Sequence, residues 1–258
     1  TAYEISACLV GSEMCIRDSH TRARATTPAA PSPDGQMVTR WRSRLGEKGP
    51  VTEADGLAML ADFGLVTPGM ARVASLHELE AALSDMHFPV VIKTAEDYAH
   101  KSDVGGVRLN IADAVAASAA YQDMALRLGP QALVMEMVPS GTELSLGAIY
   151  DPGFGPVVIV SAGGVMIEFL ADKVAARAPF DADDARHLLG ELRISELLAG
   201  YRGQPPANME AVVTQLVRFS QMVAALDDAI AEIDINPMIC SADGSCAVDC
   251  LVVPGPQN

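Results

Sequence analysis

Several features on which other classes of protein depend are scarce or missing in this chain of 258 residues. Basic side chains are few: 18 Lys and Arg stand against 33 Asp and Glu, which gives a formal net charge of −15 at pH 7. This charge argues against nucleic acid and anionic membrane surfaces as partners. A polyanionic ligand must therefore be held by local cations that act against the field of the whole chain.

Cysteine is also scarce, and the sequence has only Cys8, Cys15, Cys240, Cys246 and Cys250. They form no CxxC pair and have no histidine at metal-site spacing, so we expect reduced core residues rather than a metal centre. The longest apolar stretch, residues 157–167, contains two glycines and is too short to span a bilayer. Together these absences predict a cytoplasmic protein without a membrane segment.

The P-loop sequence GxxxxGK[ST] is missing too, but residues 91–107, VIKTAEDYAHKSDVGGV, offer another way to bind phosphate. A β-branched run ends at Lys93, and His100 and Lys101 follow it. Gly105 and Gly106 then lead into the next strand-like run. Cations neutralise phosphate charge, and glycines let backbone N–H groups approach the oxygens. The alternative interpretation is a surface lysine after a strand, followed by an ordinary Gly-Gly turn.

The first part of the chain differs in composition from the remainder. Residues 1–19 resemble translated sequencing-adapter sequence, so we treat them as an artefact and the chain as a fragment. Residues 20–47 begin with a run rich in Pro, Ala and Thr, and we expect a linker. Arg40, Arg42 and Arg44 surround the only tryptophan within it, as a solvated or docking segment. A single folded domain is expected over residues 48–258, with a first lobe at about 48–129 and a second at about 130–258.

Apolar periodicity and turn residues predict both helices and strands in that domain. Helices are expected at residues 52–64, 75–86, 113–128, 181–190, 194–200 and 207–226. Strands are expected at residues 89–93, 107–111, 132–137, 143–150, 156–160, 165–170, 230–235 and 246–253. Because strict βαβ alternation is missing and many strands look half-buried, the pattern favours an α+β fold with antiparallel sheets.

Two glutamates flank the end of the strand predicted at residues 132–137. Glu136 lies in that strand, and Glu143 follows one short loop later. A strand-to-loop junction offers backbone N–H and C=O groups that suit the edge of an adenine. The later carboxylate is placed to accept hydrogen bonds from ribose hydroxyls. The alternative is a pair of exposed glutamates beside a turn.

Oxygen-bearing side chains recur near the C-terminus in IAEIDINPMI. Glu232, Asp234 and Asn236 alternate along one strand and so share a face. Asp249 follows in an apolar run, AVDCLVV. Oxygen ligands on neighbouring strands suit Mg²⁺, which takes one or two protein ligands plus phosphate and water oxygens. The alternative, an exposed polar strand face, fits Glu232 better than Asp249.

Two arginines outside these groups are weaker candidates. Arg177 follows VMIEFLADKVAA and is placed either for a phosphate contact or for a surface ion pair. Arg202 lies in a glycine-bounded loop, GYRG, with a site or interface role as the less favoured alternative.

Five segments together resemble the ATP-grasp domain of NDP-forming acyl-CoA synthetases, such as acetate–CoA ligase (ADP-forming). The segments are FPVVIKTAEDYAHKSDVGGVRLNI, VMEMVPSGTE, YDPGFGPVVIVSAGGVMIE, GYRGQPPA and EIDINPMI with the later AVD. They occur in one order over residues 50 to 253. The resemblance implies an ATP-grasp fold, in which two lobes with antiparallel sheets grip a nucleotide.

The resemblance also implies residue roles. Lys93 is similar to the phosphate-contacting lysine of the first lobe, and Lys101, Gly105 and Gly106 belong to the same phosphate loop. The adenine hinge corresponds to Glu136, Met137 and Val138, the ribose ligand to Glu143, and a phosphate contact to Arg177. Asn236 and Asp249 resemble the Mg²⁺ ligands. Asp234 matches an acidic position that steadies a phosphohistidine, and His100 matches a histidine that relays a phosphoryl group.

The implied reaction is acyl-CoA + ADP + phosphate ⇌ carboxylic acid + CoA + ATP, through acyl phosphate and phosphohistidine. The chain would supply the ATP/ADP and Mg²⁺ half. A CoA-binding and acyl-CoA ligase domain, or an alpha subunit, would carry the phosphorylated histidine in a hetero- or homo-oligomer. The hinge departs from the family pattern, since VMEMV stands where VQEMV is commoner.

Two other functions stay open at this point. One is a nucleotide- or acyl-CoA-sensing regulatory module of a protein acetyltransferase. The other is a different ATP-grasp ligase, against which HKSDVGG argues.

Overall fold

The computed structural model describes residues 33–96, 101, 104–164 and 172–256, which form two compact units. The smaller unit runs from Pro68 to Pro139, and the larger one combines residues 33–67 with residues 140–256. Each unit contains one sheet, and the strand pairs in both sheets are antiparallel. The expected α+β class with antiparallel sheets is confirmed.

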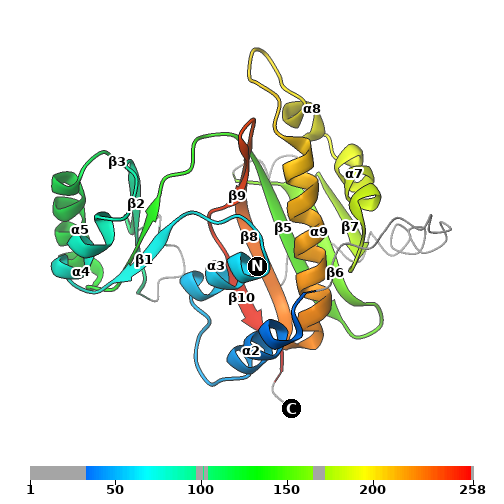
Figure 1. The fold of residues 1–258 in the computed structure, drawn as a ribbon, viewed down its shortest axis with the longest axis horizontal. Helices are drawn as coiled ribbons and strands as arrows, with labels where there is room; N and C mark the ends of the chain where they lie inside the picture. The colour runs from blue at the N-terminus through cyan, green and yellow to red at the C-terminus, as the bar shows by residue number, and fades with distance from the viewer. Residues whose placement is uncertain (1–32, 97–100, 102–103, 165–171, 257–258) are drawn as a thin grey trace. The chain divides into compact units, whose positions relative to one another are not determined.

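The sheet of the smaller unit has the strand order β1-β4-β2-β3. Its strands are β1 (Met70–Val73), β2 (Val90–Thr94), β3 (Val107–Ile111) and β4 (Ala132–Glu136). Helices α4 (Leu76–Leu83) and α5 (Ala114–Leu128) pack against this sheet and against each other (Figure 1). Each helix begins at a side-chain cap, because Ser75 accepts from the Glu78 N–H and Asp113 from the Ala116 N–H.

The sheet of the larger unit has the order β10-β8-β5-β6-β7, and β9 pairs with β8. Its strands are β5 (Thr142–Asp151), β6 (Gly155–Ala162), β7 (Lys173–Arg177), β8 (Ile230–Ser241), β9 (Gly244–Ala247) and β10 (Leu251–Pro254). Its helices are α2 (Gly35–Leu45), α3 (Glu53–Asp62), α7 (Ala182–Glu191), α8 (Ser195–Leu198) and α9 (Met209–Leu226), with a 3-10 turn η1 (Asp227–Ala229).

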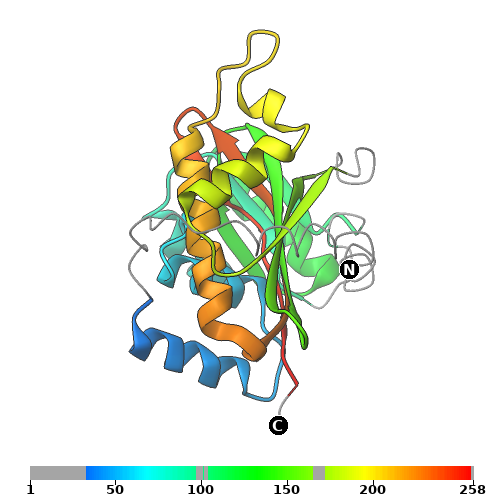
Figure 2. The ribbon, with the colours of Figure 1, turned by 90° about the vertical axis from the view of Figure 1, so that its right-hand side faces the viewer.

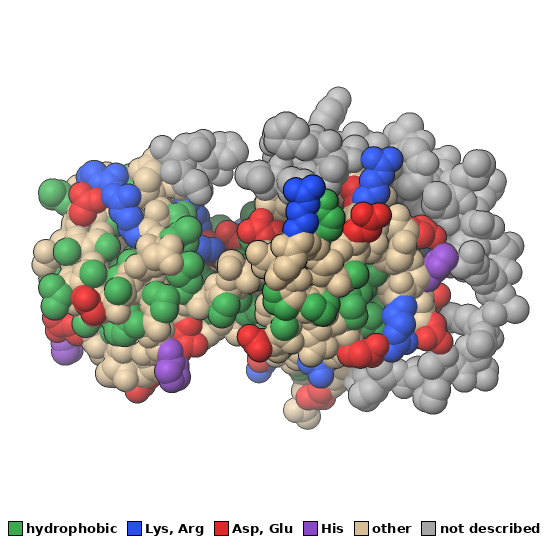
Figure 3. Space-filling model, turned by 90° about the horizontal axis from the view of Figure 1, so that it is seen from above, with side chains coloured by type: hydrophobic (Ala, Val, Ile, Leu, Met, Phe, Trp, Pro, Cys, Tyr) green, Lys and Arg blue, Asp and Glu red, His purple; other side chains and the backbone are tan. Residues whose placement is uncertain are grey.

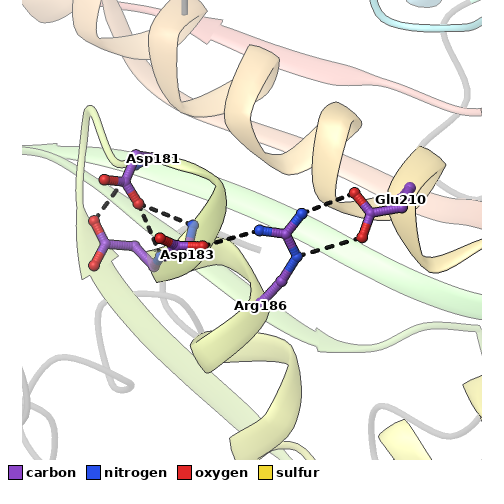
Figure 4. A network of polar contacts seen from close by, with 5 residues as sticks. Asp181, Asp183, Arg186 and Glu210 are labelled. Carbon is purple, nitrogen blue, oxygen red and sulfur yellow. Dashed lines mark hydrogen bonds and ion pairs between the residues drawn. The ribbon is translucent and has the colours of Figure 1, made fainter. Parts of the chain in front are cut away.

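Helices α7 and α9 lie on the same face of the larger sheet (Figure 2). Arg186 of α7 joins them, because its guanidinium binds Asp183 at 3.0 Å and Glu210 of α9 at 2.8 Å (Figure 4). Alternation along the strands places apolar side chains beneath these helices. In β8, Ile233 and Ile235 are fully buried, and Asp234 lies between them on the opposite, polar face.

Residues 35–45 form helix α2, which corrects part of the linker expected over residues 20–47. Trp41 and Leu45 are one helical turn apart and are both buried. Arg42 donates hydrogen bonds to the Leu226 carbonyl and, at 2.7 Å, to the Asp228 carboxylate. These partners lie more than 180 residues later in the chain, at separations of 184 and 186. A local sequence pattern therefore gave no sign of this packing.

The division into two units also differs from the lobes expected at about 48–129 and 130–258. Strand β4 belongs to the smaller unit because it pairs with both β1 and β2. Helix α3 belongs to the larger unit, where it packs on β10. Strands β1 and β7 were not expected, and the strand predicted at residues 246–253 is two strands, β9 and β10. The strand predicted at 165–170 falls outside the described residues.

A helix that spans a bilayer needs about 20 predominantly apolar residues. None of the helices in the described part of the chain has both the length and the apolar character needed to cross a membrane.

Candidate functional site

Polar side chains from neighbouring strands meet on the polar face of the larger sheet. Asp234 lies on β8, and Ser145 lies on the adjacent strand β5. The Ser145 hydroxyl donates a hydrogen bond to Asp234 Oδ1 at 3.2 Å. This bond restrains a carboxylate that the sequence analysis proposed for catalysis. Ser145 itself was missed, although its position two residues after Glu143 places both side chains on the same strand face.

Asp249 reaches this region from the connection between β9 and β10. Both of these strands pair with β8, β9 from Met238 onward and β10 up to Asp234. The connection is held to β8 by a hydrogen bond from the Val248 N–H to the Pro237 carbonyl, at 3.2 Å. The chain around Asp249 therefore lies alongside the Asn236–Pro237 step, as the metal prediction requires.

The electrostatics of this group favour a cation. Burial raises the pKa of the Asp234 carboxyl, the Ser145 hydrogen bond lowers it, and the negative charge of Asp249 raises it. A divalent ion beside these carboxylates would reduce their repulsion. Among the described residues, no set of three His, Cys, Asp and Glu side chains forms a metal centre by itself. A cation here would take few protein oxygens and complete its shell from ligand and water oxygens, as Mg²⁺ does.

Gly163 and Gly164 follow the end of β6 and lie between Glu143 and Asn236, to which they donate hydrogen bonds. The Gly163 N–H donates to the Glu143 carbonyl at 2.8 Å, and the Gly164 N–H donates to Asn236 Oδ1 at 3.0 Å. Gly164 has φ +57, and a Cβ at this position would overlap the Glu143 carboxylate. The Gly-Gly pair thus permits a close approach that a side chain would block. It places the predicted ribose ligand and a predicted metal ligand on the two sides of one residue.

Strand pairing places the two cations of β7 differently relative to this group. Arg177 pairs with Val157, whereas Lys173, at the other end of β7, pairs with Ser161. Ser161 in turn pairs with Ser145, beside Asp234. Four residues along a strand correspond to about 13 Å. The row of Lys173 leads through Ser161 and Ser145 to the Asn236–Pro237 step, whereas the row of Asp234 leads through Gly147 and Ile159 to Ala175, between the two cations. A sequence pattern does not distinguish Lys173 from Arg177, because it does not give the register of β7 against β6.

The predicted phosphate loop closes onto the end of β2 in the smaller unit. Lys93 is buried, 9% exposed, and pairs with Val107 of β3. The Thr94 N–H donates to the Gly106 carbonyl and the Gly106 N–H donates to the Lys101 carbonyl, both at 2.7 Å. A Cβ on Gly106 would lie 2.6 Å from the Thr94 methyl carbon and 2.9 Å from the Lys101 carbonyl oxygen, so only glycine fits.

The backbone at Gly106 therefore lies beside the end of β2 and the Lys101 carbonyl, and Gly105 has φ +67. The phosphate contacts of Lys93, Lys101, Gly105 and Gly106 stay a prediction. The remaining member of the prediction, His100, lies outside the described residues.

The predicted hinge begins at Glu136, whose carboxylate is engaged within the smaller unit. Glu136 Oε1 accepts from the His87 N–H and contacts His87 Nδ1, both at 2.8 Å. The His87 backbone hydrogen bond is the main reason why the pKa of Glu136 is lowered. The N–H groups of Glu136 and Met137 donate to Gly69 and Pro89 at 2.9 and 3.0 Å. An incoming base would therefore find its N–H donor at Val138.

The comparisons with known proteins extend this description. The family model of the ATP-grasp domain matches residues 45–253. This chain belongs to the ATP-grasp family.

Sequence comparison with curated proteins shows which kind of ATP-grasp domain this chain resembles. The chain is 32% identical over 216 residues to the beta subunit of acetate–CoA ligase (ADP-forming) I of Pyrococcus furiosus, covering 80% of this chain and 93% of that subunit. It is 34% identical over 220 residues to acetate–CoA ligase (ADP-forming) I of Archaeoglobus fulgidus, covering 81% of this chain and 32% of that protein. The resemblance to the ATP-grasp portion of NDP-forming acyl-CoA synthetases, which are acid–thiol ligases, is confirmed.

A solved structure agrees with this placement. Acetyl-coenzyme A synthetase 1 of Ca. Korarchaeum cryptofilum, in complex with coenzyme A and Mg-AMPPCP, gives a TM-score of 0.74 at 30% identity. The similarity covers 86% of this chain and 100% of that chain. In that structure a phosphohistidine segment points towards the nucleotide binding site.

Proposed function

We propose that this ATP-grasp domain binds Mg-ATP and transfers its terminal phosphoryl group to a histidine of a CoA-binding partner polypeptide. This step is one half of the reaction acyl-CoA + ADP + phosphate ⇌ carboxylic acid + CoA + ATP. The observation that carries the proposal is the grouping of Asp234, Asn236 and Asp249 along β8. Asp234 is held by Ser145, and Asn236 by the Gly164 N–H.

The residues present suit a magnesium ion. Asn236 offers an amide oxygen already oriented by Gly164, and Asp249 offers a carboxylate from the adjacent connection. When bound, Mg²⁺ would neutralise negative charge on the phosphate oxygens. Asp234, whose pKa is raised by burial, would face the incoming imidazole of the partner. A carboxylate in that position accepts the ring N–H and holds the tautomer in which the other nitrogen attacks phosphorus.

The nucleotide contacts are divided between the units in this proposal. Lys93, Lys101 and the N–H groups around Gly105 and Gly106 would bind phosphate oxygens. The Val138 N–H would bind the adenine edge, and the Glu143 carboxylate would accept hydrogen bonds from the ribose. Arg177 remains the predicted phosphate contact of β7, and Lys173, which pairs with Ser161, is the second candidate and the one that the register favours.

The partner and the relay histidine are the remaining parts of the proposal. A CoA-binding domain or alpha subunit would supply the phosphorylated histidine, as the similarity to a beta subunit suggests. His100 would relay the phosphoryl group between ATP and that histidine. If His100→Asn leaves phosphoryl transfer to the partner unchanged, the relay role is wrong.

Calorimetry and a transfer assay together test the proposed function. We expect Mg-ATP to bind the purified chain, and EDTA to remove that binding. We also expect label to pass from radiolabelled ATP to the partner polypeptide. Lys93→Gln should weaken nucleotide binding, whereas Lys48→Gln, a change at an exposed lysine of the larger unit, should not. Binding without transfer to an added partner would instead support a sensing module, and no binding would overturn the proposal.

A further inference from the structure

The connection between α8 and α9 presents a tyrosine and an arginine to solvent. Residues 201–206, YRGQPP, are all exposed, and Tyr201 retains 47% of its accessible surface. The Arg202 guanidinium carbon lies 5.2 Å from the centre of the Tyr201 ring. This distance is within the range of a cation–π contact. The connection therefore exposes an aromatic ring and a positive charge that contact each other.

The backbone of residues 200–204 restrains the positions of Tyr201 and Arg202. Gly200 and Gly203 have φ +96 and φ +87, and Arg202 between them has φ +47. A non-glycine residue in this region costs energy and persists where its surroundings require it. The Gln204 N–H donates to the Tyr201 carbonyl at 3.0 Å and closes the turn. A Cβ on Gly200 would lie 3.0 Å from the Gln204 carbonyl oxygen, so the two sides of the loop are close together.

Arg202 differs in its contacts from several arginines of the larger unit. Arg42, Arg44 and Arg186 each bind a carboxylate within the unit, as Figure 4 shows for Arg186. Within the described residues, the Arg202 guanidinium contacts the Tyr201 ring. The whole chain carries a formal net charge of −15. Arg202 is exposed and has no carboxylate partner in the part of the chain that the structure describes, so its guanidinium can bind an external anion.

The loop is attached at the end of the larger sheet that carries Glu143. After the loop, the Asn208 N–H donates to the Ser241 carbonyl of β8 at 2.8 Å, two residues beyond Ile239, which pairs with Glu143. Before the loop, the N–H groups of Arg193 and Ile194 donate to Asp172, the residue before Lys173, at 2.9 and 2.8 Å. Figure 1 shows the loop projecting beyond this end of the sheet, and Figure 2 agrees.

We infer that Tyr201 and Arg202 form a docking contact for an acidic segment of the partner polypeptide that carries the phosphorylated histidine. This inference rests on the proposed function. Lys173 and Arg177 of the same unit are the candidate phosphate contacts in the proposed function, so Arg202 is not needed to bind the nucleotide. Seen from above, basic side chains of the larger unit lie scattered among acidic ones (Figure 3). Arg202, whose position the loop restrains, therefore offers a local positive charge that orients an acidic segment of the partner. The net negative charge of the chain would otherwise repel such a segment.

Phosphoryl transfer from radiolabelled ATP to the CoA-binding partner polypeptide tests the inference when the partner concentration is varied. Arg202→Gln should raise the KM for the partner about three- to tenfold and leave kcat within about twofold, because a rim charge guides encounter rather than chemistry. Arg202→Lys should retain most of the effect of the charge. Raising the salt concentration should raise the KM of the unmodified chain more steeply than that of Arg202→Gln. Arg193→Gln, a change at an exposed arginine in the same part of the unit, is the matched control.

Three outcomes would overturn this docking role. The KM for the partner is unchanged in Arg202→Gln, or Arg193→Gln raises it equally, or Arg202→Gln weakens Mg-ATP binding by the chain alone. If the unmodified chain transfers no label, the proposed function fails instead. Direct calorimetric binding of the partner to the unmodified and Arg202→Gln chains then still decides the docking contact, because equal affinities would contradict it.

Discussion

The side-chain oxygen of Asn236 accepts a hydrogen bond from the backbone N–H of Gly164 at 3.0 Å. The bond fixes which end of the amide faces Gly164, because only the oxygen can accept. The same oxygen has a second lone pair, which is available to a cation. Since a Cβ on Gly164 would overlap the Glu143 carboxylate, one glycine orients a predicted metal ligand and adjoins a predicted ribose ligand.

Removal of either proposed metal ligand should uncouple nucleotide binding from magnesium. We expect Asn236→Ala and Asp249→Asn each to weaken Mg-ADP binding by about 10- to 100-fold, since the ion loses a ligand from a small protein set. Titration calorimetry at several Mg²⁺ concentrations measures the loss. Asp243→Asn is the matched control, because Asp243 is an exposed carboxylate in the turn between β8 and β9. A metal site elsewhere is indicated if the magnesium dependence of both variants equals that of the control.

Replacement of Gly164 by alanine should damage the site by steric overlap rather than by backbone strain alone. Gly155 has φ +76, similar to φ +57 at Gly164, but a Cβ at Gly155 would have open space around it. Both alanine variants should lose about 1 kcal/mol of stability through the positive φ. Only Gly164→Ala should also weaken nucleotide binding, by about tenfold or more, because the Glu143 carboxylate must move. Melting temperatures and Kd values for both variants separate the two effects, and equal Kd values would refute the steric argument.

The Asp234 carboxylate should destabilise the fold at neutral pH in the absence of a cation. Burial raises its pKa above the ordinary value of 3.8. As pH rises above that value, the unfolded chain loses the proton first, so the free energy of unfolding decreases until the folded carboxyl also ionises. Asp234→Asn keeps an oxygen for the Ser145 hydroxyl and removes the charge. We expect it to raise Tm by about 2–4 °C at pH 7.5 and to abolish phosphoryl transfer to the partner.

The pH dependence provides the control for that variant. The difference in Tm should shrink as the pH falls toward 3.8, where the carboxyl of the unmodified chain becomes protonated in both states. Thermal unfolding across this pH range, in EDTA, measures the trend. A Tm difference that stays constant with pH would mean that the variant acts through packing and not through the charge.

The sequence predicted structure correctly where the prediction depended only on residues of one strand. The alternation of Ile233 and Ile235 with Asp234 predicted the burial of the two isoleucines correctly, because strand periodicity depends only on neighbouring residues. Glu232, on the face of Asp234, is also buried, so the alternative of an exposed polar face does not hold for it. Pairing between distant segments was not predictable in the same way. The burial of Trp41 depends on packing that α2 finds only in the folded unit, where Arg42 binds Leu226 and Asp228, so the segment resembled a linker.

The register between β6 and β7 is the part of the site that the sequence did not predict. Lys173 and Arg177 are equivalent in a sequence pattern, since both lie on the same face of a short strand. Which of them lies beside Ser161 depends on how β7 pairs with β6, and this register is set by the fold.

The contrast between the two cations of β7 can be measured directly. Lys173→Ala should weaken Mg-ATP binding by about tenfold, because its row includes Ser161 and Ser145 beside Asp234. Arg177→Ala should change the Kd by less than about twofold, since Arg177 lies about 13 Å farther along the strand. Both residues are exposed, so neither change should unfold the chain, and circular dichroism confirms this. If Arg177→Ala is the more damaging variant, the nucleotide phosphates lie toward the opposite end of the sheet. Asn236 and Asp249 would then not be the phosphate-bearing part of the site.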